Sequence, residues 1–471
     1  MEERYDSWPV KAFTVSMIVW GLASLLYGVL ISLQMVYPQL NFSEYFTYGR
    51  IRAIHTNGSA LGFGLSGIFA LTYYFVPRLS KAPLFAPGIA KAMFWFYNLT
   101  IVVAVITLSL GYSSSKEYAE LEWPVDIMVV LVWVMYAINM LGTIFTKTVD
   151  KMYVSLWYII ASVLGVAILY IFNNLALPAG LFKSYSLYAG VNDANMQWWY
   201  GHNIVAMIFT APILAIFFYF LPKVTGLPLY SHRLSLVAFW SLIFLYLWTG
   251  AHHLIWTPVP DWIQTVAIAF SIMLIAPSWG SVINGYLTMN GNWEQMRTNY
   301  LTKFFIMGIT FYGLQTLQGP SQAIRSISSL IHYTDWVPGH VHMGTMGWFA
   351  MTIMASFYYV IPKLYKTDLY SVRLANLHFW LVFTGQIIYS ITMWIAGIMQ
   401  GAMWKATNPD GSLKYTIQDS ITASYPYWDL RAVGGVIFIA GFIVFAWNMY
   451  KTIQSSKENE PAGSVKTAGA I

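Results

Sequence analysis

The sequence predicts an all-α protein that crosses a membrane many times. Hydrophobic residues make up 58% of the 471 residues and charged residues only 9%, so the apolar side chains exceed what a water-facing core can hold. A helix of roughly 20 apolar residues spans a bilayer, because its backbone groups bond within the segment. Twelve such stretches are predicted, at 12-37, 52-77, 89-111, 123-146, 151-172, 200-222, 232-255, 261-289, 301-318, 337-362, 372-399 and 431-452.

The basic residues predict the orientation of these helices. The first apolar run is too long for a signal peptide and is expected to be retained. With Met1 in the cytoplasm, most of the 25 Lys and Arg residues fall on the cytoplasmic side, so both termini are expected there. The net charge of +6 then reflects membrane topology, and no nucleic-acid partner is expected. We expect one membrane domain over 1-455 and a disordered cytoplasmic tail over 456-471.

An internal repeat groups the twelve helices into three similar four-helix arcs. Aromatic and aliphatic residues followed by Pro and a basic residue end the second, sixth and tenth helices, at Pro77-Arg78, Pro222-Lys223 and Pro362-Lys363. Related Leu-Tyr-Ser sequences open the seventh and eleventh helices, from Leu229 and Leu369. Recurrence of the same helix-end and helix-start sequences every four helices is typical of a repeated unit.

The repeat places six histidines at one depth. His55, His202, His340 and His342 lie 20 or 22 residues before the prolines that end their helices, roughly 30 Å from the cytoplasmic end at 1.5 Å per residue. His252 and His253 reach a similar depth on the seventh helix. A single intramembrane histidine is often only a hydrogen-bonding residue, but six at one level indicate a metal site.

The spacing of these histidines divides the layer. Two residues along a helix turn by about 200°, so His340 and His342 face opposite sides and serve two cofactors. His252 and His253 stand together where Pro258 must end the helix, so both can face one small ion. His202 is available as its third ligand. The chain has no cysteine, which excludes thiolate ligands, iron-sulfur clusters and covalent heme attachment within it.

Three motifs around these residues resemble subunit I of the heme-copper oxygen reductases, over essentially all twelve helices. They are Trp198-Trp199-Tyr200-Gly201-His202-Asn203, Gly250-Ala251-His252-His253-Leu254 and Gly339-His340-Val341-His342-Met343-Gly344. The resemblance implies that His55 and His342 bind a low-spin heme b, that His340 is the proximal ligand of a high-spin heme b, and that the remaining three histidines bind copper (CuB).

The position of one tyrosine resembles the C-type, or cbb3-type, cytochrome c oxidases. Most of the superfamily carries a tyrosine four residues after the first copper histidine, where this chain has Ala206. In the C-type the cross-linked tyrosine lies on the seventh helix, and Tyr246 stands there, seven residues before His253. The resemblance implies a covalent bond between Tyr246 and His202. An ordinary packing role for this tyrosine is the alternative.

The resemblance extends to proton uptake. All 19 acidic residues are expected in loops, tails or helix ends, so a proton relay must use hydroxyls, amides and water. Four residues match the single input pathway of the cbb3-type family, each with ordinary helix-helix hydrogen bonding as the alternative: Thr210, Ser235, Asn284 and Tyr312.

Several residues near the expected hemes match or depart from the family pattern. The family carries a Glu-Gly-Pro motif near the proximal ligand, whereas this chain reads Gln318-Gly319-Pro320. An amide holds no negative charge, so a shifted heme potential is expected. Four outer residues are candidates for heme propionates, with ordinary interfacial charge as the alternative: Arg50, Arg52, Arg325 and His332. His232 and His378 are assigned no ligand role.

The resemblance implies a terminal respiratory oxidase of the bacterial inner membrane. It would reduce O2 to water and translocate protons, with membrane-anchored monoheme and diheme cytochrome c subunits and a c-type cytochrome as electron donor. A calcium ion near the heme propionates is also expected. The nearest rival is a nitric oxide reductase with non-heme iron, which carries a Glu ligand where this chain has Ala206. A channel or transporter with structural histidines is the rival from another class.

Overall fold

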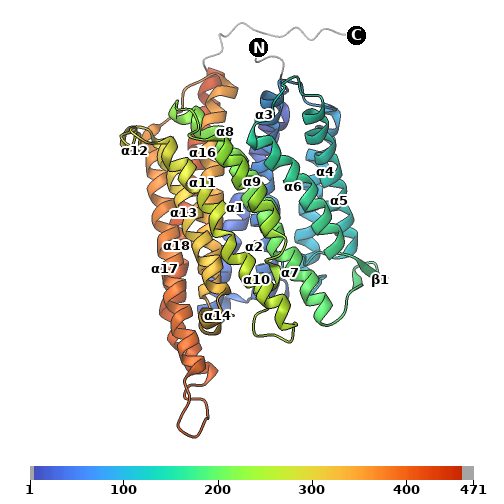
Figure 1. Ribbon diagram of the computed structural model, residues 1–471, viewed down its shortest axis with the longest axis vertical. Helices are drawn as coiled ribbons and strands as arrows, with labels where there is room; N and C mark the ends of the chain where they lie inside the picture. Colours follow the sequence, from blue (N-terminus) through green and yellow to red (C-terminus); the bar gives the residue numbers. More distant parts are fainter. Residues whose placement is uncertain (1–4, 459–471) are drawn as a thin grey trace.

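The computed structural model describes residues 5–458 and is a bundle of long helices (Figure 1). Ten helical stretches are long and apolar enough to cross a membrane among the described residues. The helices of the first half are α1 (Trp8–Val36), α2 (Tyr48–Asn57), α3 (Leu65–Ser80), α4 (Pro87–Ser109), α5 (Trp123–Phe145), α6 (Val154–Asn173), α7 (Val191–Val205), α8 (Ala211–Thr225) and α9 (His232–Tyr246). The second half contains α10 (Asp261–Met273), α11 (Ile275–Thr288), α12 (Gln295–Thr298), α13 (Tyr300–Ala323), α14 (Arg325–Ile331), α15 (Trp336–His342), α16 (Met351–Tyr365), α17 (Val372–Lys405) and α18 (Ile417–Glu458).

Short segments complete the chain. The antiparallel strands β1 (Ala176–Gly180) and β2 (Lys183–Ser186) form a hairpin in a connection for which the sequence predicts no regular structure. The 3₁₀ turns are η2 (Pro38–Leu40), η3 (Glu44–Phe46) and η6 (Gly250–Leu254), and the π-helical segments are η4 (Gly58–Gly64), η5 (Ala206–Thr210) and η7 (Met343–Ala350).

Each of the twelve predicted segments coincides with helical structure, but two of them fail the criteria for a membrane span. The segment predicted at 232-255 is not one helix, because α9 ends at Tyr246 and its 15 residues are too few to span a bilayer. The segment at 301-318 forms α13, which is 24 residues long but does not count among the ten apolar spans.

The break after α9 has a local cause. Thr249 donates from its hydroxyl to the Tyr246 carbonyl (2.8 Å), and His252 N–H bonds to Thr249 O in the tighter 3₁₀ pattern. Gly250 then packs against the backbone of α7, where an added Cβ would lie 2.9 Å from Trp199 Cα. The absence of a side chain at Gly250 therefore lets the turn η6 approach α7 closely.

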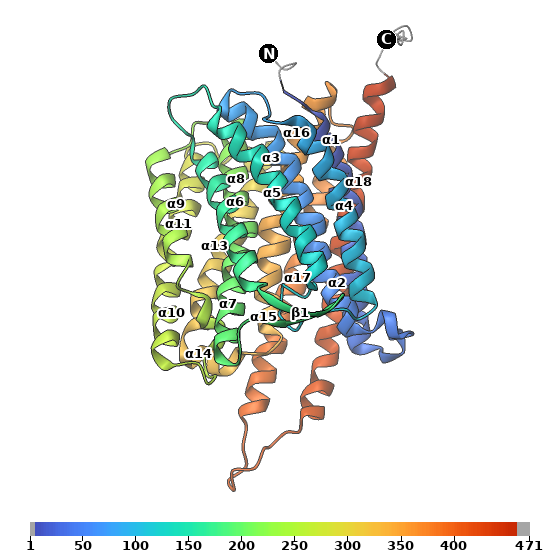
Figure 2. The ribbon, with the colours of Figure 1, turned by 90° about the vertical axis from the view of Figure 1, so that its right-hand side faces the viewer.

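The two longest helices run past the rest of the bundle. Helices α17 and α18 pack against each other and project beyond the other helices at the end opposite the start of α1 and the end of α18 (Figure 2). The sequence placed the start of the last helix at 431, whereas α18 begins at Ile417, so this boundary was wrong. Helix α18 also continues to Glu458, inside the tail predicted to be disordered, and 459-471 lie outside the described residues.

One hydrogen-bond pattern occurs three times at the end of the bundle where α1 begins. Asn284 donates to Ser231 O (2.9 Å) and accepts from Ser231 N, while Thr288 accepts from Tyr230 N. Asn448 and Thr452 hold Ser371 and Tyr370 in the same way, and Asn139 and Thr143 hold the backbone of Phe85 and Ala86. In each case an Asn and a Thr one helical turn apart fix the start of another helix.

A second pattern links three other helical stretches. A π-helical segment follows the histidine of α2, the histidine of α7 and the two histidines of α15. Insertion of a π turn is frequent near functional sites, because it changes the direction of the side chains that follow it. These three histidine-bearing stretches therefore share one local irregularity.

Candidate metal centre

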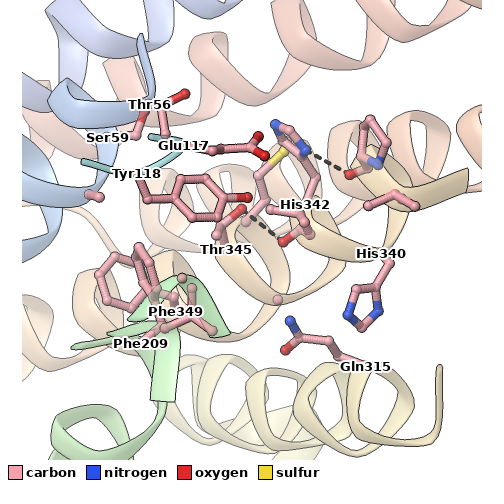
Figure 3. Close-up of a pocket in the computed structure, with 18 of the residues that line it drawn as sticks. Thr56, Ser59, Glu117, Tyr118, Phe209, Gln315, His340, His342, Thr345 and Phe349 are labelled. Atoms are coloured by element: carbon pink, nitrogen blue, oxygen red, sulfur yellow. Dashed lines mark hydrogen bonds between the residues drawn. The ribbon is translucent and has the colours of Figure 1, made fainter. Parts of the chain in front are cut away.

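The six predicted histidines line one cavity of about 730 Å³ inside the bundle. We call it the metal cavity. Its wall comes from α1, α2, α7, α9, α13, α15 and α18 and from the turn η6. His340 and His342 point to different parts of the metal cavity from the same short helix (Figure 3), as their spacing predicted.

His55 and His342 face each other across one part of the metal cavity. Their ring centres are 6.5 Å apart and their planes differ by 5°. His55 Nδ1 bonds to Ser24 O (2.8 Å) and His342 Nδ1 to Pro338 O (2.8 Å). A carbonyl oxygen only accepts, so each Nδ1 carries the proton and each Nε2 is free as a ligand. One metal ion fits between them, because metal–imidazole bonds are about 2 Å long.

His340 is fixed separately on the opposite side of α15. Its Nδ1 lies 3.2 Å from Gln318 Oε1, and its ring is parallel to that of Trp336 at 6.0 Å. The amide oxygen accepts a hydrogen bond from Nδ1–H, which leaves Nε2 free as a ligand. Gln318 itself does not line the metal cavity, so it contacts the His340 ring on the Nδ1 side, outside the cavity.

The other three histidines form a compact group. Nitrogen atoms of His202, His252 and His253 lie within 4.8 Å of one another. His252 Nδ1 bonds to Ser271 Oγ (2.6 Å), and Ser271 donates in turn to Ala267 O (2.6 Å), so the imidazole donates and keeps Nε2 free. The His253 ring stacks on Trp198 at 4.0 Å. Three neutral imidazoles held in this way suit copper, zinc or iron.

Tyr246 ends α9 beside this group. Its ring lies 5.1 Å from that of His202, and His202 Nε2 is buried without a hydrogen-bond partner among the described residues. His202 Nδ1 is directed instead towards the group, 3.2 Å from His253 Nε2. The two nitrogens of His202 therefore differ, since Nδ1 has a neighbour in the group of three histidines and Nε2 has no hydrogen-bond partner among the described residues.

The remaining predicted residues lie in different surroundings. Thr210, Arg52 and His332 line the metal cavity, whereas Ser235, Asn284 and Tyr312 do not. Ser235 is buried and donates to His232 O (2.7 Å). Tyr312 is buried against Trp348, which does line the metal cavity.

Two of the predicted propionate partners are engaged elsewhere. Arg50 donates to Ser109 O (2.8 Å), and Arg325 pairs with Asp261 at an exposed position. Neither arginine lines the metal cavity, and their propionate role stays a prediction. Arg52 lines it and pairs with Glu117. The partners of long basic side chains depend on tertiary packing that their positions in the sequence did not reveal.

Arg431 was missed by the sequence reasoning. It is 6% exposed, lines the metal cavity and contacts the sulfur atoms of Met35 and Met393. Among residues 5–458 it has no carboxylate partner within ion-pair distance, and its Nε has no hydrogen bond. The sequence placed it at a helix end, but it lies well inside α18. A buried unpaired guanidinium is a signal for an anionic group.

Two titratable groups in loops beside the metal cavity have shifted pKa values. Burial is the main cause that lowers the pKa of His332 and raises that of Glu120. Glu120 accepts from Asn57 Nδ2 at 3.0 Å. His232 accepts a hydrogen bond from Val154 N–H, and His378 is bonded to the Tyr358 hydroxyl; both lie outside the metal cavity.

The family model described as "Cytochrome C and Quinol oxidase polypeptide I" matches residues 9–437. The chain belongs to this heme-copper oxidase subunit I family. It is 46% identical to the Cbb3-type cytochrome c oxidase subunit CcoN1 of Stutzerimonas stutzeri, over 96% of each chain. It is 42% identical to the Cytochrome c oxidase subunit 1 homolog of Agrobacterium tumefaciens (strain T37), over 96% of this chain and 85% of that protein. The subunit is thus a homologue of the cbb3-type cytochrome c oxidase subunit.

More distant relatives fit this placement. A nitric oxide reductase subunit of Stutzerimonas stutzeri is 23% identical over 93% of each chain. A solved heme-copper terminal oxidase dimer has a TM-score of 0.73 at 17% identity, and covers 94% of this chain and 84% of that one. The structural similarity supports the fold of the subunit. The oxidase relatives at 46% and 42% identity are more similar to this chain than the nitric oxide reductase subunit is.

Proposed function

We propose that this subunit reduces O2 to water at a high-spin heme b held by His340 and a copper ion held by His202, His252 and His253. His55 and His342 would hold the low-spin heme b that receives electrons. The observation that carries the proposal is the division of six imidazoles within one cavity into a facing pair, a single ring and a group of three. The metals would supply the redox chemistry when bound.

The chain's own residues would orient these groups. Four of the six histidines donate a hydrogen bond from Nδ1–H to a backbone carbonyl, to Gln318 or to Ser271. These bonds fix the tautomer in which Nε2 is the available ligand atom. The orphaned His202 Nε2 beside Tyr246 supports a covalent bond between these two residues. The phenol of Tyr246 would then supply one proton and one electron as the O–O bond breaks.

The repeated hydrogen-bond pattern and the three π-helical segments support three four-helix arcs. With α9 and η6 counted together and α13 included, the arcs would comprise twelve membrane-crossing segments. Both termini would face the cytoplasm of a bacterium and the protein would lie in its inner membrane. Monoheme and diheme cytochrome c subunits would deliver electrons from a c-type cytochrome donor, because this chain has no cysteine for heme attachment. A calcium ion near the heme propionates belongs to the same proposal.

The proton pathway through Thr210, Ser235, Asn284 and Tyr312 is part of this proposal, and Asn284 also makes a structural contact. Its amide is occupied by the Ser231 backbone, as the amide of Asn448 is by Ser371. We expect Asn284→Ala and Asn448→Ala to lower thermal stability similarly, by about 2 kcal/mol each for the buried hydrogen bonds lost. Thermal unfolding and proton uptake should be measured together. Slower proton uptake in the Asn284 variant alone would support its pathway role, and equal uptake in the two variants would exclude it.

Gln318 is expected to set the potential of the heme that His340 would bind. Gln318→Glu places a carboxylate on His340 Nδ1, which makes the imidazole a stronger donor to ferric iron. We expect a midpoint potential lower by about 50 mV, which corresponds to roughly 1 kcal/mol for one electron. A spectroelectrochemical titration measures this shift, and Gln322→Glu, which lines the metal cavity on the same helix, is the control. Identical potentials in wild type and Gln318→Glu would show that this position does not tune the heme.

The proposed activity is tested by oxygen consumption of the purified complex with a reduced c-type cytochrome. We expect turnover that consumes O2 and proton uptake from one side of a proteoliposome. The rival activity has its own assay, nitric oxide consumption under anaerobic conditions. Turnover of nitric oxide with no oxygen consumption would contradict the oxidase proposal and identify the subunit as a nitric oxide reductase.

A further inference from the structure

A second, smaller cavity adjoins the metal cavity. Its volume is about 190 Å³, and we call it the side cavity. Tyr333 and Asp335 line both cavities, so the two are separated only by the chain that leads into α15. The side cavity lies between this chain and the extended parts of α17 and α18, and is lined by Tyr333, Asp335, Gln400, Trp404, Ile417, Ser420, Ile421, Ser424 and Trp428.

The side cavity is suited to water. Its volume exceeds many times the roughly 10–15 Å³ that one water molecule requires. The side chains of Gln400, Ser420 and Ser424 supply hydrogen-bonding groups to its wall. It reaches the surface at Tyr333 and Ile417, which are 74% and 66% exposed. Ile417 is the first residue of α18, so this opening lies at the start of that helix.

A single carboxylate occupies the junction of the two cavities. Asp335 Oδ2 accepts from Gln400 Nε2 (2.6 Å) and Trp428 Nε1 (2.6 Å), and Asp335 N–H donates to Gln400 Oε1 (2.8 Å). These bonds fix the carboxyl group from the side of α17 and α18. Asp335 is therefore the carboxylate that the two cavities share.

Polar groups continue from Asp335 to the predicted heme ligand. The Tyr389 ring stacks on His342 at 4.3 Å, and Tyr389 interacts electrostatically with both Arg431 and Asp335. Tyr389 and Arg431 both line the metal cavity. The wall of the metal cavity therefore carries a phenol, a guanidinium and a carboxylate in addition to the ring of His342.

We propose that the two cavities form one hydrophilic route from the metal cavity to the surface at the projecting ends of α17 and α18, with Asp335 as its proton-carrying group. The carboxylate takes a proton from water in the metal cavity and releases it to water in the side cavity, so the group is unchanged after each transfer. The route would carry product water and protons. The claim that product water and protons use the route rests on the proposed function, whereas the existence of the route does not.

Access to the side cavity can be tested without enzymatic activity. The chain contains no cysteine, so a single introduced thiol is the only one on this subunit. In the purified complex in nanodiscs, Ile421→Cys should react with a charged methanethiolsulfonate reagent at least about tenfold faster than Ile437→Cys, since thiol reactivity depends on access to water. Both positions are half-buried on α18, but Ile437 lines neither cavity. Equal, slow reaction at both positions would overturn the route.

The role of Asp335 needs a separate measurement. In proteoliposomes, Asp335→Asn should slow proton release several-fold relative to proton uptake, and Asp335→Glu should restore release. Heme spectra report whether the site remains intact in both variants. Asp429→Asn, a substitution on α18 outside both cavities, is the control. Unchanged release in Asp335→Asn with intact heme spectra would exclude Asp335 as the proton carrier. If oxygen reduction itself fails, the thiol measurement still decides whether the route exists.

Discussion

His252→Ala is expected to empty the copper site and lower oxygen consumption by more than about a hundredfold. Loss of a group that only orients a ligand typically costs 10–100-fold in affinity or activity, and His252 would be a ligand itself. The two remaining imidazoles cannot complete the site, because the turn η6 offers no other nitrogen ligand beside His253. Copper per chain and oxygen consumption are the measurements.

Two variants make this result specific. His232→Ala removes a histidine from the same region of sequence, but its ring accepts from Val154 N and lies outside the metal cavity, so copper should stay. Ser271→Ala removes the acceptor of His252 Nδ1, and should lower copper content partly. A copper content per chain in His252→Ala equal to that of the wild type would show that the group of three histidines is not the copper site.

Tyr246→Phe is expected to retain both hemes and lose most of the oxygen reduction. Removal of the phenol hydroxyl removes the proton donor beside the proposed copper site, and positioned proton donors typically contribute 10²–10⁴-fold. Phenylalanine preserves the ring that packs at 5.1 Å from His202, so structural damage should be small. The measurements are oxygen consumption and the reduced-minus-oxidised heme spectrum.

The same tyrosine allows a chemical test of the cross-link. Proteolysis of the wild-type subunit should yield one branched peptide that contains both His202 and Tyr246, and the Phe variant should yield two separate peptides. Tyr158→Phe, at a buried position outside the metal cavity, should leave the branched peptide intact. Recovery of His202 and Tyr246 only in separate wild-type peptides would reject the covalent bond.

The spacing of histidines predicted much of the site. Two positions along one helix necessarily separate His340 from His342, and the apolar segment that Pro258 bounds places His252 and His253 near its end. These relations follow from helix geometry alone. The structure brings all six rings to one cavity, as expected from their common distance to the helix ends.

Irregular backbone could not be predicted in this way. The seventh segment was read as one helix because its composition is apolar throughout, yet the Thr249 hydroxyl and the close packing of Gly250 on α7 convert its end to a 3₁₀ turn. Tyr246 is the last residue of α9, and its ring lies 5.1 Å from that of His202 on α7, the partner that the resemblance implied for it. Tertiary contact, and not helical spacing, places this tyrosine.

Charged groups were also placed less well than metal ligands. The stretch before residue 431 is too polar to predict a membrane helix, so the first turns of α18 were not expected. Arg431 was therefore placed at a helix end and not in the wall of the metal cavity. Arg50 and Arg325 have flexible side chains that find partners in Ser109 and Asp261. The junction at Asp335 depends on α15, α17 and α18 together, which no single segment of sequence reveals.

Metal and heme content of the purified complex tests the central claim most directly. Our account predicts one copper ion and two b-type hemes for each copy of this chain, in addition to the c-type hemes of its partner subunits. Copper should be lost in His252→Ala, and the low-spin heme signal in His55→Ala. One additional non-heme iron with no copper would contradict the account and assign the site to nitric oxide reduction.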